Sequence, residues 1–287
     1  MSVRFGIVNV GLASTAGATA SLGQRAEAAG FDSVWTVEHV VVPAGYESRY
    51  PYHPSGKMPG HVEAGIPDPL VWLTWIAAST TTIKVGSAVV ILPQRNPVVL
   101  AKELATLDAL SGGRAILGVG IGWLEEEMRA IGAPPFADRA AVTEEHIAAL
   151  RELWRSPEPT FTGRWSSFDR AQMYPKPAQA GGVPIVIGGH SKAAARRAGR
   201  IGDGFYPTAS TVEELDELFR TARAAAVDAG RDPDALELTC ATPPTVDDVR
   251  RREEIGAHRV LIPALGRDAE EQARMIETFA ADVIARV

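Results

Sequence analysis

A glutamate and a histidine follow a strand-like run of the sequence and could together carry acid–base chemistry. Glu38 and His39 come directly after the apolar, β-branched run at 33–37. Histidine titrates near neutral pH and can move protons, and a neighbouring carboxylate can bias its charge state. Adjacent residues of a strand point in opposite directions, so the two side chains need not touch. A histidine at a strand end serves structure as often as function, and both interpretations stand here.

A second segment, with the sequence Gly-Gly-His-Ser, has the features of an anion site. It ends an apolar run and is followed at once by a helical pattern. Glycines let the backbone approach an oxyanion, the first turn of a helix has unsatisfied N–H groups, and the helix dipole favours negative charge. These features predict phosphate binding at Gly188, Gly189, His190 and Ser191. The simpler alternative is a tight turn in which Ser191 only caps the helix.

Several motifs of known enzyme classes are incomplete or absent, which disfavours those classes. The glycines at 118, 120 and 122 do not have the spacing of the dinucleotide fingerprint, and they do not follow the first strand. We therefore expect them to keep side chains away from a flat ligand rather than to bind a nicotinamide cofactor. The sequence has no GxSxG, GxxxxGK[ST] or HExxH motif, which disfavours a hydrolase, an ATPase and a metal site. The acidic run at 125–127 is interpreted as the first turn of a helix.

The elements that must position these residues alternate along the chain. Eight apolar or β-branched runs are separated by helical patterns, and they lie at 3–9, 33–37, 83–92, 114–119, 183–187, 204–206, 236–241 and 259–263. Such alternation predicts parallel strands joined by helical crossovers. Eight units in about 250 residues favour a (β/α)8 TIM barrel over a doubly wound open sheet, and we expect one domain over residues 1–287. A long loop follows the second strand, at 43–69, and an insertion at 157–177 after the fourth is expected to form a hairpin.

Composition limits the partners. The 287-residue chain has a net charge of -6, which excludes a nucleic-acid partner because phosphate backbones require dense positive surfaces. The single cysteine, Cys240, cannot form an internal disulfide and excludes a cysteine-based zinc cluster. No secretory signal is visible, and no apolar run reaches the roughly 20 residues that span a bilayer. We expect a soluble, cytoplasmic protein without a membrane partner or a metal.

Taken in order, these segments resemble the bacterial luciferase-like oxidoreductase family, and especially its branch that uses the deazaflavin coenzyme F420. The resemblance extends over residues 3–207 and is weak beyond them. The matching segments lie at 37–43, 85–97, 101–108, 110–114, 117–123, 136–139, 188–191, 197–198 and 202–204.

The resemblance implies a ring-shaped cofactor over the carboxyl-terminal mouth of the barrel. It implies a non-proline cis peptide between Ala88 and Val89, in a bulge of the third strand that backs the ring. It places the phosphate end of the cofactor at 188–191 and makes His39 the proton donor or acceptor, paired with Glu38 near the reactive ring edge. The expected cofactor-binding residues are Glu38, Ala88, Val89, Trp123, Gly188, Gly189, His190 and Ser191.

One departure from the family affects the substrate. Sugar-phosphate dehydrogenases of this branch have a glutamate at the position of Trp123 and a tryptophan at that of Ala44. We therefore expect an apolar or aromatic substrate pocket that includes Tyr46 and Tyr50. The expected function is hydride transfer between F420 and a small organic substrate, in a homodimer as in relatives. A monooxygenase using reduced FMN and a non-catalytic flavin-binding protein remain as alternatives.

Overall fold

The expected eight-stranded parallel barrel is confirmed by strand pairing. The computed structural model describes residues 2–10, 15–59, 65–209, 211–266 and 268–287. Every neighbouring pair in the ring is parallel, and the ring closes because the last strand pairs with the first and the third pairs with the fifth. An open sheet is therefore excluded. The barrel strands are β1 (Arg4–Asn9), β2 (Ser33–Thr36), β3 (Lys84–Ser87), β5 (Ala115–Gly120), β8 (Ile185–Gly189), β9 (Gly204–Pro207), β10 (Glu237–Ala241) and β11 (Arg259–Pro263).

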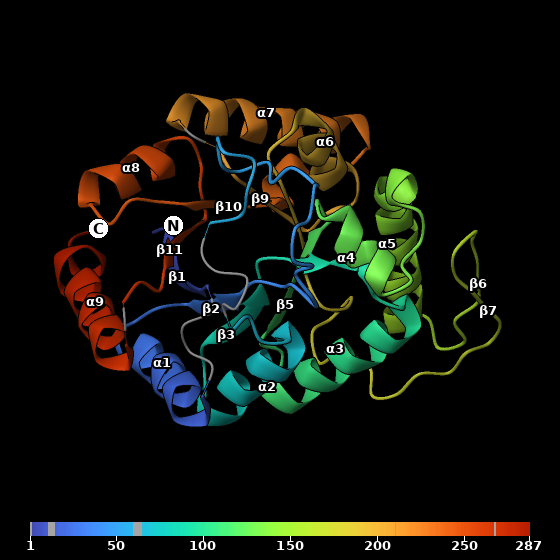
Figure 1. Ribbon diagram of the computed structural model, residues 1–287, viewed down its shortest axis with the longest axis horizontal. Helices are drawn as coiled ribbons and strands as arrows, with labels where there is room; N and C mark the ends of the chain where they lie inside the picture. The colour runs from blue at the N-terminus through green and yellow to red at the C-terminus, as the bar shows by residue number, and fades with distance from the viewer. Residues whose placement is uncertain (1, 11–14, 60–64, 210, 267) are drawn as a thin grey trace.

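Helices surround the strands and close the core from outside (Figure 1). Their starts follow local chemistry: Asn96 accepts hydrogen bonds from the amides of Val98 and Val99, and Thr211 accepts one from the amide of Glu214. Apolar faces then pack on the barrel, and most of the buried apolar residues form one continuous cluster. The helices are α1 (Ala16–Ala28), α2 (Pro69–Ser79), α3 (Pro97–Ser111), α4 (Glu125–Ala130), α5 (Arg139–Arg155), α6 (Lys192–Ile201), α7 (Val212–Asp228), α8 (Val246–Glu254) and α9 (Ala269–Asp282).

The third strand is interrupted, as the family resemblance implied. The peptide between Ala88 and Val89 is cis, and it separates β3 from a short continuation, β4 (Val90–Ile91). β3 pairs with both β2 and β5, whereas β4 pairs with β5. The Ser87 hydroxyl donates to the carbonyl of Gly118 and accepts from its amide, both at 2.9 Å. The backbone of β5 therefore lies directly against the interruption.

The amino-terminal end of the barrel is filled by a tryptophan and an arginine. Trp35 is fully buried, and a Cβ built on Gly86 would lie 2.6 Å from its ring, so only glycine fits there. The guanidinium of Arg259 lies 5.5 Å from the centre of that ring, and Arg259 is itself fully buried. It pairs with Asp32 at 2.8 Å and also with Glu237. These contacts close the base of the barrel with charge-paired, tightly packed side chains.

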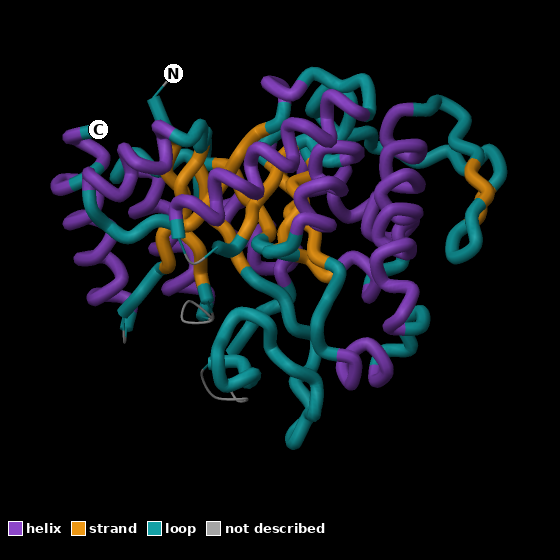
Figure 2. The backbone as a smooth tube through the Cα atoms, turned by 90° about the horizontal axis from the view of Figure 1, so that it is seen from above, coloured by secondary structure: helices purple, strands orange, loops and turns teal. Residues whose placement is uncertain are grey.

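Two excursions leave the barrel, both predicted from the sequence. The loop after β2 extends beyond the ends of the strands, on the opposite side from the chain termini (Figure 2). The insertion contains an antiparallel hairpin, β6 (Phe161–Thr162) and β7 (Ser167–Phe168), which projects from the side of the molecule (Figures 1 and 2). No helix in the described residues has the length and apolar character needed to cross a bilayer.

Candidate functional site

The acidic partner of His39 is a glutamate that comes 88 residues later in the chain. Nδ1 of His39 lies 2.9 Å from Oε2 of Glu127. The other carboxylate oxygen, Oε1, accepts from the amides of Val40 at 2.5 Å and Val41 at 3.3 Å. The Glu127 side chain is 0% exposed and that of His39 is 9% exposed. Glu127 therefore fixes both the imidazole and the backbone that follows it.

Glu38 points away from His39, so the expectation that these two neighbours form the acid–histidine pair is wrong. Glu38 is buried and accepts from the amide of Ile91 at 2.5 Å and from the guanidinium of Arg95. Burial raises the pKa of the Glu38 carboxyl, while Arg95 and the Ile91 amide oppose that rise. The reason for the separation is the alternation of an extended backbone, which directs neighbouring side chains to opposite sides. Glu38 instead ties the end of β2 to β4.

The interrupted third strand contacts the ends of two other strands through Val89. A Cβ built on Gly120 would lie 2.5 Å from Cγ2 of Val89, and one built on Gly188 would lie 2.7 Å from its Cγ1. Ala88 packs against the side chains inside the barrel. The expectation that the glycines at 118 and 120 clear space for a flat ligand is therefore wrong, because Ser87 and Val89 occupy the space beside them.

In the Gly188–Ser191 segment, the structure shows the helix cap that was the simpler alternative. Ser191 is the cap of α6, and its hydroxyl accepts from the amide of Ala194 at 3.2 Å. The amides of Lys192 and Ala193, the other two of this turn, have no partner within the helix, and a helix start of this kind can bind an anion. Gly189 has a φ of +136°, a conformation that favours glycine, and leaves the strand end without a side chain.

Six aromatic side chains form a continuous row across this end of the barrel. Trp123 is in edge-to-face contact with three rings, those of His39, Tyr46 and Tyr50, at 5.7, 5.4 and 5.1 Å between centroids. Tyr50 continues the row to Tyr52 at 5.3 Å, and Tyr52 meets His190 at 5.1 Å. This aromatic row, made of His39, Trp123, Tyr46, Tyr50, Tyr52 and His190, connects the ends of β2, β5 and β8. It brings the expected substrate residues beside the expected proton-transfer residue.

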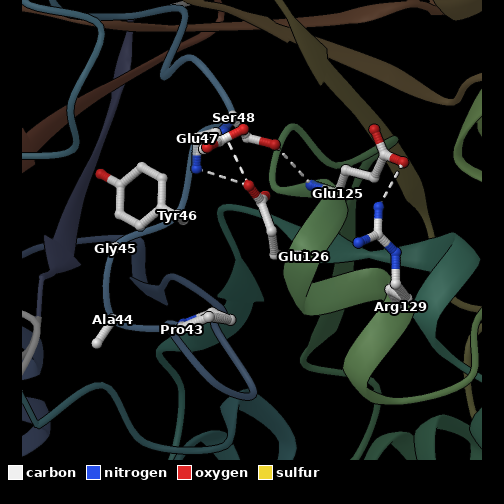
Figure 3. A pocket seen from close by; sticks show the side chains of 9 residues that line it. All are labelled: Pro43, Ala44, Gly45, Tyr46, Glu47, Ser48, Glu125, Glu126 and Arg129. Carbon is white, nitrogen blue, oxygen red and sulfur yellow. Dashed lines mark hydrogen bonds and ion pairs between the residues drawn. The ribbon is translucent and has the colours of Figure 1, made fainter.

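The loop that carries the tyrosines is fastened to the start of α4. Oε1 of Glu126 accepts from the amides of Glu47 at 2.6 Å and Ser48 at 3.0 Å, and the Ser48 hydroxyl accepts from the amide of Glu125 at 3.1 Å (Figure 3). Hydrogen bonding with Ser48 and the Glu47 amide lowers the pKa of Glu126 to about 2. A hollow of about 490 Å³ lies between this part of the loop and α4. The residues around it are Pro43, Ala44, Gly45, Tyr46, Glu47, Ser48, Glu125, Glu126 and Arg129.

Two residues of this site were not expected from the sequence. Glu127 belongs to the first turn of α4, as predicted for the acidic run, but it faces inward. A helical period would have grouped it with Leu124 and Met128, which are both buried, and that was the available signal. Tyr206, at the end of β9, packs with Ala88 against the barrel interior, and burial raises the pKa of its phenol. Nothing in the local sequence singled it out.

Metal chemistry has no visible support in the site. Within the residues that the structure describes, no three histidine, cysteine, aspartate or glutamate side chains form a group that could hold an ion. The acids near His39 are instead engaged by the backbone or by arginine. The described arrangement offers an imidazole held by a carboxylate, a glycine-rich strand end followed by a helix start, and aromatic surface between them.

Comparisons with known proteins identify the family of the chain. The chain matches the luciferase-like monooxygenase family over residues 5–281. An uncharacterized protein of Mycobacterium tuberculosis is 32% identical over 275 residues, covering 93% of this chain and 94% of the relative. An F420-dependent glucose-6-phosphate dehydrogenase of Amycolatopsis mediterranei is 35% identical over 236 residues, covering 80% and 62%.

The fold is also shared with a solved structure of an F420-dependent secondary alcohol dehydrogenase. The TM-score is 0.81, with 20% identity and 99% of each chain covered. With the family match extending over nearly the whole sequence, the chain belongs to the luciferase-like monooxygenase family.

Proposed function

We propose that this protein is an oxidoreductase that transfers a hydride between coenzyme F420 and a small organic substrate. The observation that carries the proposal is that one aromatic row joins the carboxylate-held imidazole of His39 to His190, at the strand end where we propose that the cofactor phosphate binds. The Amycolatopsis relative is named for F420-dependent oxidation, which supports the choice of cofactor over FMN.

The residues present fit a phosphate-bearing deazaflavin. The first-turn amides of α6 and the backbone of Gly188 and Gly189 would hold its phosphate, and no side chain at Gly189 obstructs them. Ala88, Val89 and Trp123 would contact its ring, with His190 and Ser191 at the phosphate end. Glu38 would contribute indirectly by holding β4. When bound, the cofactor supplies the carbon that takes or gives hydride.

His39 supplies the proton step of the same reaction. With an alcohol as substrate, Nε2 of His39 would take the hydroxyl proton during oxidation and would return it to the oxygen during reduction. Nε2 makes no hydrogen bond to the described parts of the chain, whereas Nδ1 is bound to Glu127. Trp123 contacts the ring of His39, and Tyr46 and Tyr50 contact Trp123, so aromatic surface extends from His39 and favours an apolar or aromatic substrate.

Cofactor titration tests this proposal. Purified protein is titrated with F420 and, separately, with FMN, and binding is followed by fluorescence quenching. We expect saturable binding of F420 and turnover with some member of a panel of alcohols, aldehydes, ketones and enones. Tight binding of FMN without F420 binding would favour a reduced-FMN monooxygenase. Binding without turnover across the panel would favour a non-catalytic carrier.

A second copy of the chain is the partner we propose. Val71 and Trp75 lie one turn apart on α2 and are exposed, and Val99 on α3 is exposed as well. The helices α2 and α3 lie side by side (Figure 1). Exposed apolar side chains such as these are stabilised when a symmetric dimer buries them. Light scattering after gel filtration is expected to give a dimer that W75E converts to a monomer. The buried, unpaired Cys240 fits the cytoplasm as the proposed location.

A further inference from the structure

The two oxygens of the Glu127 carboxylate have different partners. Oε1 accepts from two backbone amides, those of Val40 and Val41, and Oε2 faces Nδ1 of His39 at 2.9 Å. The carboxylate is completely excluded from solvent. A backbone N–H group can only donate a hydrogen bond. If a donor replaced Oε1, the N–H groups of Val40 and Val41 would both face another donor.

This division of partners determines where the proton of His39 lies. A carboxylate only accepts, so a neutral imidazole at this distance must carry its proton on Nδ1 and donate it to Oε2. The lone pair is then on Nε2, which makes no hydrogen bond within the described chain. The ring is also restrained from its side, because it contacts the edge of Trp123.

We propose that Glu127 is a positioning residue that holds His39 in the Nδ1–H tautomer, with Nε2 available to exchange a proton with the substrate. The catalytic consequence rests on the function proposed above, but the tautomer does not. The chemical logic is that of a buried carboxylate orienting a catalytic imidazole, where loss of the correct tautomer lowers activity greatly even when the geometry is kept.

Replacing the carboxylate of Glu127 with an amide is predicted to move the ring proton of His39 from Nδ1 to Nε2. In E127Q the carbonyl oxygen must still accept from the amides of Val40 and Val41, so the NH2 group takes the place of Oε2. It then donates to Nδ1 of His39, which must become an acceptor and move the ring proton to Nε2. E125Q is the matched control, since Glu125 is in the same helical turn and pairs with Arg129 instead.

The test is nitrogen NMR of protein labelled with [15N]histidine, recorded in the absence of cofactor with the imidazoles neutral. The signals of His39 are assigned by their loss in H39N. We expect a protonated Nδ1 in the wild type and in E125Q, and a protonated Nε2 in E127Q. A wild-type His39 with its proton on Nε2, or an E127Q that keeps it on Nδ1, would overturn the proposal. If E127Q does not fold, the wild-type spectrum alone decides.

Kinetics separate this inference from the proposed function. With F420 and an active substrate, E127Q is expected to lower kcat by about 10²–10⁴-fold while the Kd for F420 changes less than about threefold. An unchanged kcat in a variant whose tautomer has switched would overturn the catalytic part. A wild type that never turns over F420 would overturn the proposed function and leave the tautomer assignment standing.

Discussion

The two methyl groups of Val89 lie against two glycines from different strands. Cγ2 would be 2.5 Å from a Cβ on Gly120, and Cγ1 would be 2.7 Å from one on Gly188. Rotation about χ1 cannot relieve a clash at one glycine without approaching the other. The interrupted third strand is therefore interlocked with the ends of β5 and β8, where we propose that the cofactor binds.

An added methyl group at Gly120 is expected to be costly. G120A should lower the free energy of unfolding by about 1–3 kcal/mol, because the Cβ overlaps Val89 in a packed region. Urea denaturation checks this value, with G17A as control, since nothing lies within 4 Å of a Cβ there. V89A should reduce the cost of G120A, so the double variant should lose less free energy of unfolding than the sum of the two single variants. Losses that simply add would contradict the proposed clash.

Loss of the His39 imidazole is expected to affect turnover more than binding. H39N should reduce kcat by about 10²–10⁴-fold, the usual contribution of a general acid–base group. The Kd for F420 should change less than about tenfold, because the segment that we propose to bind its phosphate, Gly188–Ser191, is on another strand. Steady-state kinetics and fluorescence titration measure the two quantities separately. H53N is the control, since His53 is exposed and bonds to Ser55; turnover unchanged in H39N would remove His39 from the mechanism.

Much of the fold was predictable because its signals are local. The run that forms β11 was predicted with the same bounds as observed, since an apolar run between polar residues needs no distant information. The interruption between Ala88 and Val89 is different. Hydrophobic pattern alone predicts one continuous strand at 83–92, and the cis peptide was expected from family resemblance only.

The candidate site was only partly predictable because its key contact is long-range. Glu127 meets His39 across 88 positions of sequence, and an acidic helix start is already explained by the helix dipole. Pairing of the adjacent residues Glu38 and His39 was the more obvious hypothesis from the sequence. It fails because the alternation of an extended backbone directs their side chains to opposite sides. The aromatic row likewise depends on how the loop at 43–69 folds across the barrel, which no local pattern specifies.

Acid sensitivity is expected from Glu27, which joins α1 to the segment before β3. Burial raises the pKa of Glu27, but the amides of Thr82, Ile83 and Thr81, at 2.6, 2.9 and 2.9 Å, outweigh it and hold the pKa at about 2 instead of 4.5. A carboxyl with a depressed pKa stabilises the fold fully above pH 4.5, and this contribution is lost as the pH falls toward 2.

E27Q should therefore be less stable than the wild type near pH 7 by about 1 kcal/mol, since partial exposure screens the interaction. The difference between the two proteins should shrink as the pH is lowered toward 2. Denaturation midpoints across this range provide the measurement. E277Q, which removes an exposed partner of Arg25, should change stability by less than about 0.5 kcal/mol. A constant difference between E27Q and wild type at all pH values would contradict the assignment.

Hydrogen exchange can test whether Glu126 fixes the loop that carries Tyr46, Tyr50 and Tyr52. E126A removes the acceptor of the Glu47 and Ser48 amides, so exchange of these amides should accelerate by about tenfold or more. Peptides from β5 should exchange as in the wild type. E125Q, which leaves those two acceptor contacts intact, is the control. Equal protection of the loop in E126A and wild type would mean that Glu126 does not hold it.

The filled base of the barrel limits the route by which ligands can bind and leave. Trp35 and Arg259 are both fully buried and close the amino-terminal end. Cofactor and substrate must then arrive and depart through one entrance, the carboxyl-terminal mouth that the aromatic row crosses. Two reactants that bind at this mouth one beneath the other would follow a fixed order, in which the deeper one enters first and leaves last.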